Sequence, residues 1–143
     1  MISSDDIKFK HPFCMTVAGP SQSGKTFFVA KLIELKHQLI ENHPSKIIYC
    51  FKTYQTIFDD LKSQLIYIKF INRLPNDDID TENFLIVLDD LMTECIDNKD
   101  ILHLFTIGSH HNNTSVIFLT QNIYEQGKYA RSISLNSHYL VFF

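Results

Sequence analysis

The segment GPSQSGKT, residues 19–26, carries the residue types and spacing that best fit a chemical task. It satisfies the pattern G-x-x-x-x-G-K-[ST], which is typical of a loop that binds phosphate groups. The glycines allow a tight turn and a close approach to a triphosphate, and successive N–H groups then point at the anion from the positive start of a helix. A chance match in an ordinary strand-to-helix turn is the alternative. The residues expected to contact phosphates are Gly19, Pro20, Ser21, Gln22, Ser23, Gly24, Lys25 and Thr26.

Four side chains have individual roles in this prediction. Lys25 is expected to reach the β- and γ-phosphates of ATP, and the Thr26 hydroxyl to coordinate Mg²⁺. Asp89 and Asp90 follow the most apolar run of the chain, FLIVL, and ligands of open parallel sheets bind at the carboxyl ends of strands. We therefore predict that Asp89 holds Mg²⁺, directly or through water, and that Asp90 accepts a proton from the attacking water or orients it. The alternative is an acidic pair that caps a strand at a solvated turn.

The elements that must position these residues alternate between buried strands and helices. Helical spacing or capping residues indicate helices over Lys25–Ile40, Tyr54–Ser63 and Asp97–Gly108. Continuous apolar runs predict strands at Phe13–Ala18, Ile47–Phe51, Phe84–Leu88, Ser115–Thr120 and Tyr139–Phe143, with a further strand at Ile66–Ile71. Strands without polar alternation are covered on both faces, so we expect an α/β fold with a largely parallel sheet. An acidic loop, Leu74–Glu82, and a polar segment, Tyr124–Ser134, complete the chain.

Length and composition bound the class of protein. The chain has 143 residues, 45% of them apolar and 20% charged, which suits one globular domain with its own core. No apolar run approaches the roughly 18–20 residues of a membrane span, and the start lacks the order of a signal peptide. The scattered cysteines Cys14, Cys50 and Cys95 indicate a reducing compartment. We expect an N-terminal extension, 1–12, and one domain, 13–143. The apolar end suggests either a longer parent polypeptide or a domain that ends on its last strand.

Four phrases of the sequence together resemble the genome-packaging ATPases of double-stranded DNA viruses and virus-like elements. These phrases are GPSQSGKT, FLIVLDDLM, GSHHNNTSVIFLTQN and YARSISLNSHYLVFF, which span residues 13–143. The resemblance is to the FtsK/HerA-type group, with polinton-, adintovirus- and poxvirus-like packaging proteins as the nearer relatives. It implies a P-loop NTPase of the ASCE-type, RecA-like division, with five parallel strands in the order 5-1-4-3-2 and helices on both faces. It also implies a homo-oligomeric ring that threads double-stranded DNA through a pore, with capsid or portal proteins as further partners, inside an infected cell.

The same resemblance implies two further site residues. Gln121 follows the strand SVIFLT and is expected to sense the γ-phosphate or the attacking water, the alternative being a loop-starting amide. Relatives often carry an arginine just before this strand, where the present chain has His110-His111-Asn112-Asn113. Arg131 is therefore the expected finger toward a neighbouring subunit's site, and the alternative is a surface arginine on a solvated helix.

Several functions remain open at this point. A nucleotide-gated assembly module with little turnover is one alternative, because Asp90 is one methylene shorter than the glutamate usually found there. Another P-loop ATPase, AAA+ or helicase-like, is a second. A small-molecule kinase is disfavoured by the presence of only two arginines, and a GTPase by the lack of N-K-x-D after an apolar strand. A metal site at His103, His110 and His111 is disfavoured because no ligand stands at a suitable spacing.

Overall fold

A computed structural model of the chain describes residues 8–75, 83–91, 113–121 and 137–143. Several predicted features lie outside these ranges: the helix Asp97–Gly108, most of the acidic loop, the polar segment Tyr124–Ser134, the histidines 103, 110 and 111, and Arg131. Of the helices in the described part, none has the length and apolar character needed to cross a membrane.

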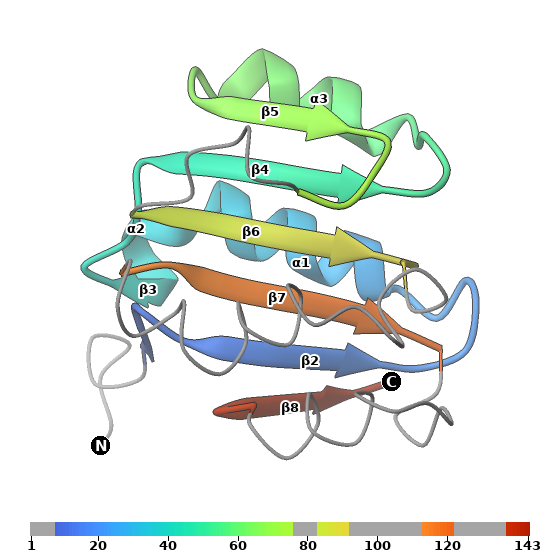
Figure 1. Cartoon of the computed structure of the whole chain (residues 1–143), viewed down its shortest axis with the longest axis horizontal. Coiled ribbons are helices and arrows are strands. Elements are labelled where there is room, and N and C mark those ends of the chain that lie inside the picture. The colour runs from blue at the N-terminus through green and yellow to red at the C-terminus, as the bar shows by residue number, and fades with distance from the viewer. Residues whose placement is uncertain (1–7, 76–82, 92–112, 122–136) are drawn as a thin grey trace.

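A six-stranded parallel sheet forms the centre of the molecule (Figure 1). Its strands follow the order β5-β4-β6-β7-β2-β8. Their bounds are β5 (Ile68–Ile71), β4 (Lys46–Phe51), β6 (Phe84–Asp89), β7 (Ser115–Thr120), β2 (Cys14–Ala18) and β8 (Tyr139–Phe142). The α/β class with a mostly parallel sheet is thus confirmed. The predicted sheet of five strands lacked one strand, because β5 joins the sheet at its edge beside β4. The other five strands, numbered in chain order, follow one another as 5-1-4-3-2.

Three short helices replace the two expected between β2 and β5. The long helix predicted from Lys25 divides at Leu35 into α1 (Lys25–Glu34) and α2 (Lys36–Leu39). Ile40 then leaves the helix for β3 (Ile40–Glu41), which pairs in parallel with β1 (Phe9–Lys10) in a separate two-stranded sheet. The buried Ile40 side chain explains this exit, since pairing with β1 places it in the core. The third helix, α3 (Ile57–Gln64), begins later than predicted.

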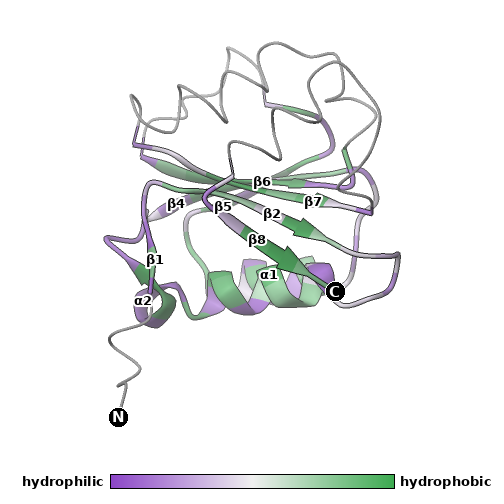
Figure 2. Ribbon diagram, turned by 90° about the horizontal axis from the view of Figure 1, so that it is seen from below, coloured by the Kyte–Doolittle hydropathy of each residue, from purple (hydrophilic) through white to green (hydrophobic). Residues whose placement is uncertain are grey.

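Both faces of the large sheet are buried, as the continuous apolar strands predicted. Side chains of alternate strand residues, such as Tyr49, Val87 and Ile117, pack with those of α1 and α3 on one face. Figure 2 shows α1 lying along that face of the sheet. The intervening residues, such as Ile86 and Val116, form a second buried cluster on the opposite face. A shift of a central strand by one residue would exchange the side chains of the two buried clusters, so the packing of these clusters opposes it.

Candidate active site

The loop between β2 and α1 depends on glycine at two points. Gly24 has a φ of 102°, a conformation that residues with a side chain rarely adopt, and the helix begins at the next residue. A Cβ atom on Gly19 would lie 2.8 Å from the Phe143 Cβ and 2.9 Å from the Ser23 Oγ. Phe143, which directly follows β8, and the loop itself therefore leave no room for a larger residue at this position. The Gly19 N–H also donates to the Thr120 carbonyl at 3.1 Å, which ties the loop to the end of β7.

The start of α1 is suited to receive an anion. No side chain caps it, and its first turn contains no acidic residue that would compete for the exposed N–H groups. The first N–H groups of a helix lack partners inside the helix and carry the positive end of its dipole. The loop and the start of the helix together thus form a site lined by backbone N–H groups, as the motif predicted for binding phosphates.

Lys25 folds back onto the same loop. Its Nζ donates to the carbonyls of Gly19, at 2.5 Å, and Pro20, at 3.1 Å. Burial lowers the pKa of Lys25, and the nearby Asp89 and Asp90 oppose that change. The ammonium group is therefore held at the mouth of the loop by two neutral carbonyls, which phosphate oxygens can replace with a stronger charged interaction.

Asp89 ends β6 and lies buried beside the loop. Its Oδ2 accepts hydrogen bonds from the Thr26 Oγ1, at 3.1 Å, and from the Tyr49 hydroxyl, at 2.6 Å. Burial raises the pKa of Asp89, while these two hydrogen bonds act in the opposite direction. Burial and the same carboxylate raise the pKa of Tyr49 well above its ordinary value, so its hydroxyl remains a donor. The two predicted magnesium ligands, Thr26 and Asp89, are thus in contact.

This donor set suits magnesium. A carboxylate and a hydroxyl supply hard oxygen ligands, and Mg²⁺ characteristically takes one or two carboxylates, waters and substrate phosphates rather than a closed protein cage. Thr26 and Asp89 would hold the ion next to the phosphate cup. In the described part of the chain, no cluster of three histidine, cysteine or acidic residues offers a competing metal site.

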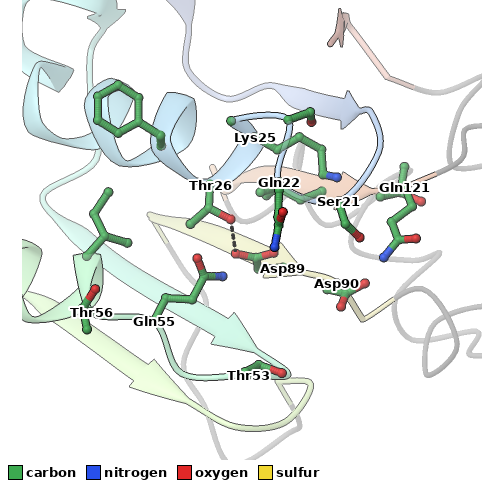
Figure 3. Close-up of a pocket in the computed structure, with 16 residues that line it drawn as sticks. Ser21, Gln22, Lys25, Thr26, Thr53, Gln55, Thr56, Asp89, Asp90 and Gln121 are labelled. Carbon is green, nitrogen blue, oxygen red and sulfur yellow. Dashed lines mark hydrogen bonds between the residues drawn. The ribbon is translucent and has the colours of Figure 1, made fainter.

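Asp90 reaches the same site through an unusual backbone conformation. Its φ of 58° is left-handed, and its N–H donates to the Leu119 carbonyl at 3.4 Å. Strand alternation would have placed its side chain on the face of Leu88, opposite to Asp89. The left-handed turn instead brings Asp90 to the cleft wall (Figure 3). Short polar residues tolerate this conformation better than most, which favours aspartate over glutamate here.

The loop, the two acids and Gln121 line a single cleft of about 720 Å³. Figure 3 shows Lys25, Thr26, Asp89, Asp90 and Gln121 gathered around it. One wall is the phosphate loop, and the floor is formed by the ends of β6 and β7. The opposite wall, which sequence reasoning missed, is the connection from β4 into α3, with Thr53, Gln55, Thr56 and Ile57. A volume of this size is typical of sites for small molecules and cofactors.

One signal in the sequence could have located Thr53 and Gln55, which the prediction missed. Thr53 and Gln55 follow the strand IIYCF, so the rule that found Asp89 at a strand end applies to them as well. Tyr49 lies within the same run, and the apolar pattern of the strand does not indicate that its hydroxyl reaches the site. The predicted finger, Arg131, lies outside the described residues.

Comparisons with known proteins reveal a likeness of fold. No protein-family model matches the chain, and no curated protein sequence matches it. Among solved structures, the genome packaging NTPase B204 from Sulfolobus turreted icosahedral virus 2, in complex with AMP, superimposes with a TM-score of 0.59 at 16% identity. The match covers 92% of this chain and 75% of that one. The same NTPase in complex with ATP-gammaS matches with a TM-score of 0.55 and 16% identity, over 99% and 76% of the two chains. The present chain thus shares the α/β fold of a packaging NTPase.

Proposed function

We propose that this chain is a magnesium-dependent ATPase subunit that drives double-stranded DNA into a viral capsid. The observation that carries the proposal is the contact between the Thr26 hydroxyl and the Asp89 carboxylate at the mouth of the phosphate loop. The fold supports it, because the similar B204 structures are of a viral genome packaging NTPase in complex with nucleotides.

In the bound state, the N–H groups of the loop and of the first turn of α1 hold the β- and γ-phosphates. Lys25 moves from the carbonyls of Gly19 and Pro20 to the phosphate oxygens. Magnesium, once bound, neutralises charge that develops on the transferred phosphoryl group. Thr26 and Asp89 would hold the ion beside the phosphate loop.

Hydrolysis needs a water molecule aligned with the γ-phosphate. Asp90 orients this water or accepts its proton, since its side chain lines the cleft next to Asp89. Gln121, at the end of β7, contacts the water or the γ-phosphate and signals phosphate loss. Arg131 of a neighbouring subunit completes the site, a contribution worth about 10³–10⁵ in rate for such fingers. A lone subunit is therefore slow.

DNA is the partner that the assembly must grip. The formal charge of one subunit is −3, so a monomer presents no general attraction for DNA. A homo-oligomeric ring solves this difficulty if the lysines of several subunits converge in its pore, with capsid or portal proteins docking outside. The proposed setting is the interior of an infected cell.

A second candidate function is a nucleotide-gated assembly module with little turnover. It is favoured by one observation, the left-handed φ of 58° that confines a short aspartate at the position of the water-activating acid. Such a module would bind nucleotide through the same phosphate loop, Thr26 and Asp89, and would hydrolyse it slowly.

Phosphate release, measured with and without double-stranded DNA at concentrations where rings form, separates the candidates. We expect magnesium-dependent release that DNA stimulates and that Lys25→Ala abolishes. Tight ATP binding with no release under any condition would favour the assembly module. No binding of magnesium and ATP by the intact chain would refute both.

A further inference from the structure

A buried tyrosine hydroxyl lies against the carboxylate of the proposed magnesium site. The Tyr49 side chain is 0% exposed, and its hydroxyl donates to the Asp89 Oδ2 at 2.6 Å. The same oxygen accepts the Thr26 hydroxyl at 3.1 Å. Among the described residues, no hydrogen bond ends on the other carboxylate oxygen, Oδ1. Both donors therefore bind Oδ2, and within the described part of the chain they leave Oδ1 available.

Sheet register explains how Tyr49 reaches this acid. Strands β4 and β6 are parallel neighbours, with Phe51 opposite Asp89 and Tyr49 opposite Val87. Residues two apart on a strand point to the same face, so Tyr49 and Asp89 lie diagonally across one face of the sheet. Diagonal neighbours are within reach of an aromatic side chain. No loop contributes to this contact, which therefore has the rigidity of the central sheet.

The ring of Tyr49 is held on its other sides. It packs against Phe58 of α3, with 4.8 Å between ring centroids, and against Phe70 of β5, at 5.3 Å. Both neighbours belong to the same buried or partly buried apolar cluster. Because a close-packed ring cannot rotate away from its rotamer, the hydroxyl stays directed at Asp89.

We propose that Tyr49 is a positioning residue for the magnesium site, which fixes the Asp89 carboxylate through Oδ2 and so directs Oδ1 to the metal or to a water bound to it. This inference rests on the proposed function. Outer partners of this kind typically contribute 10–100-fold to metal affinity by orienting the ligand they touch. Tyr49 itself touches neither the metal nor the nucleotide in this arrangement.

The test compares Tyr49→Phe with a matched control, Tyr54→Phe. Both remove one hydroxyl from the same aromatic cluster, but the Tyr54 hydroxyl donates to Asp59 on α3 and makes no hydrogen bond to Asp89. Binding of a non-hydrolysable ATP analogue is measured with Mg²⁺ and with EDTA. We expect Tyr49→Phe to leave metal-free affinity within about two-fold and to raise the half-saturating Mg²⁺ concentration about 10-fold or more. Tyr54→Phe should behave as the wild type.

A double-variant comparison tests the route of the effect. In an Asp89→Asn background, adding Tyr49→Phe should cause no further loss of magnesium dependence, because the carboxylate that Tyr49 positions is already gone. In Tyr49→Phe alone, the buried Asp89 carboxylate loses a hydrogen-bond donor, which could impair folding. The double variant has a neutral asparagine at position 89, so it remains testable in that case. A further loss in this background would overturn the proposed role.

The outcomes separate this inference from the proposed function. A folded Tyr49→Phe protein with the magnesium dependence of the wild type would overturn the positioning role and leave the ATPase proposal intact. A wild-type chain that binds the ATP analogue equally with Mg²⁺ and EDTA, or not at all, would overturn the magnesium-dependent function and the inference with it.

Discussion

The hydroxyl of Thr26 and the carboxylate of Asp89 lie 3.1 Å apart although 63 residues separate them in the chain. Thr26 lies in the first turn of the helix that follows β2, and Asp89 ends β6, with β7 lying between these two strands. The contact therefore requires the order β6-β7-β2 in the centre of the sheet. It joins the phosphate loop to the acidic strand end, and the predictions below follow from that junction.

The first prediction concerns Lys25→Ala. Its ammonium group is the charged group at the mouth of the loop, so its removal should weaken ATP binding about 10–100-fold, the range expected for a hydrogen bond to a charged group. Isothermal calorimetry with Mg²⁺ and a non-hydrolysable analogue measures the change. Lys31→Ala is the matched control, because Lys31 lies on the same helix and pairs with Glu34 at the surface. Equal affinity in both variants would contradict the assigned role.

Asp90→Asn should separate binding from hydrolysis. Asparagine tolerates the left-handed φ of 58° but cannot accept a proton, so turnover should fall about 10²–10⁴-fold while ATP affinity stays constant. Steady-state phosphate release and calorimetry give the two quantities. Asp60→Asn, on the exposed part of α3, should change neither. If Asp90→Asn retained wild-type turnover, a residue other than Asp90 would have to orient the attacking water.

Gly19→Ala should destabilise the fold as well as the site. The added Cβ would lie 2.8 Å from the Phe143 Cβ, a distance at which either the loop or Phe143 must move. Overpacking of this kind costs about 1–3 kcal/mol in the free energy of unfolding. Thermal denaturation should show a melting temperature several degrees below that of the wild type. An unchanged melting temperature would mean that Phe143 moves to accommodate the methyl group at no cost in stability.

Acidification should destabilise the protein through His11. This side chain is buried and lies 2.5 Å from the Ser115 Oγ through its Nδ1, and burial lowers its pKa below the ordinary 6.5. The unfolded chain then binds a proton more readily than the folded one, so stability falls as the pH drops below about 6.5. His11→Gln should show a smaller decrease in melting temperature between about pH 7.5 and pH 5.5. The remaining slope has another source in His43, whose pKa burial also lowers.

DNA binding should depend on both assembly and salt. A single subunit with a formal charge of −3 should bind a duplex weakly, and a ring should bind it tightly at low salt. Fluorescence anisotropy at subunit concentrations below and above assembly measures the difference. Assembled protein whose duplex affinity does not respond to salt would contradict a grip based on phosphate contacts.

Sequence reasoning located most of the sheet because its strands are continuous apolar runs with few alternatives. Ser115–Thr120 forms β7 with the bounds predicted for it, and the run FLIVL forms β6 with Asp89 added. The division of the first helix at Leu35 was missed, because the apolar spacing continues through it and only the pairing of Ile40 with β1 decides the matter. That pairing is a tertiary contact, which local spacing does not encode.

The candidate site shows the same division between local and long-range information. Gly19–Thr26 was recognisable because one short segment contains all its residues. Tyr49 and Asp89 are 40 positions apart in the chain, and their contact depends on the register of β4 against β6. The cleft wall at Thr53 and Gln55 depends on which strand neighbours β6. Such features become visible once the strand order is known.

The close fit of Gly19 against Phe143 has a mechanical consequence. The chain's first long strand and its last one are hydrogen-bonded neighbours, and the Phe143 ring also meets Phe28 of α1 edge-on, with 5.7 Å between centroids. A pull on the residue that follows β8 would be transmitted to the phosphate loop, because Phe143 lies close against Gly19 and its N–H donates to the Ala18 carbonyl. In the proposed ATPase, force applied at that strand would alter the binding of the triphosphate, and release of the γ-phosphate would change the stiffness of this contact.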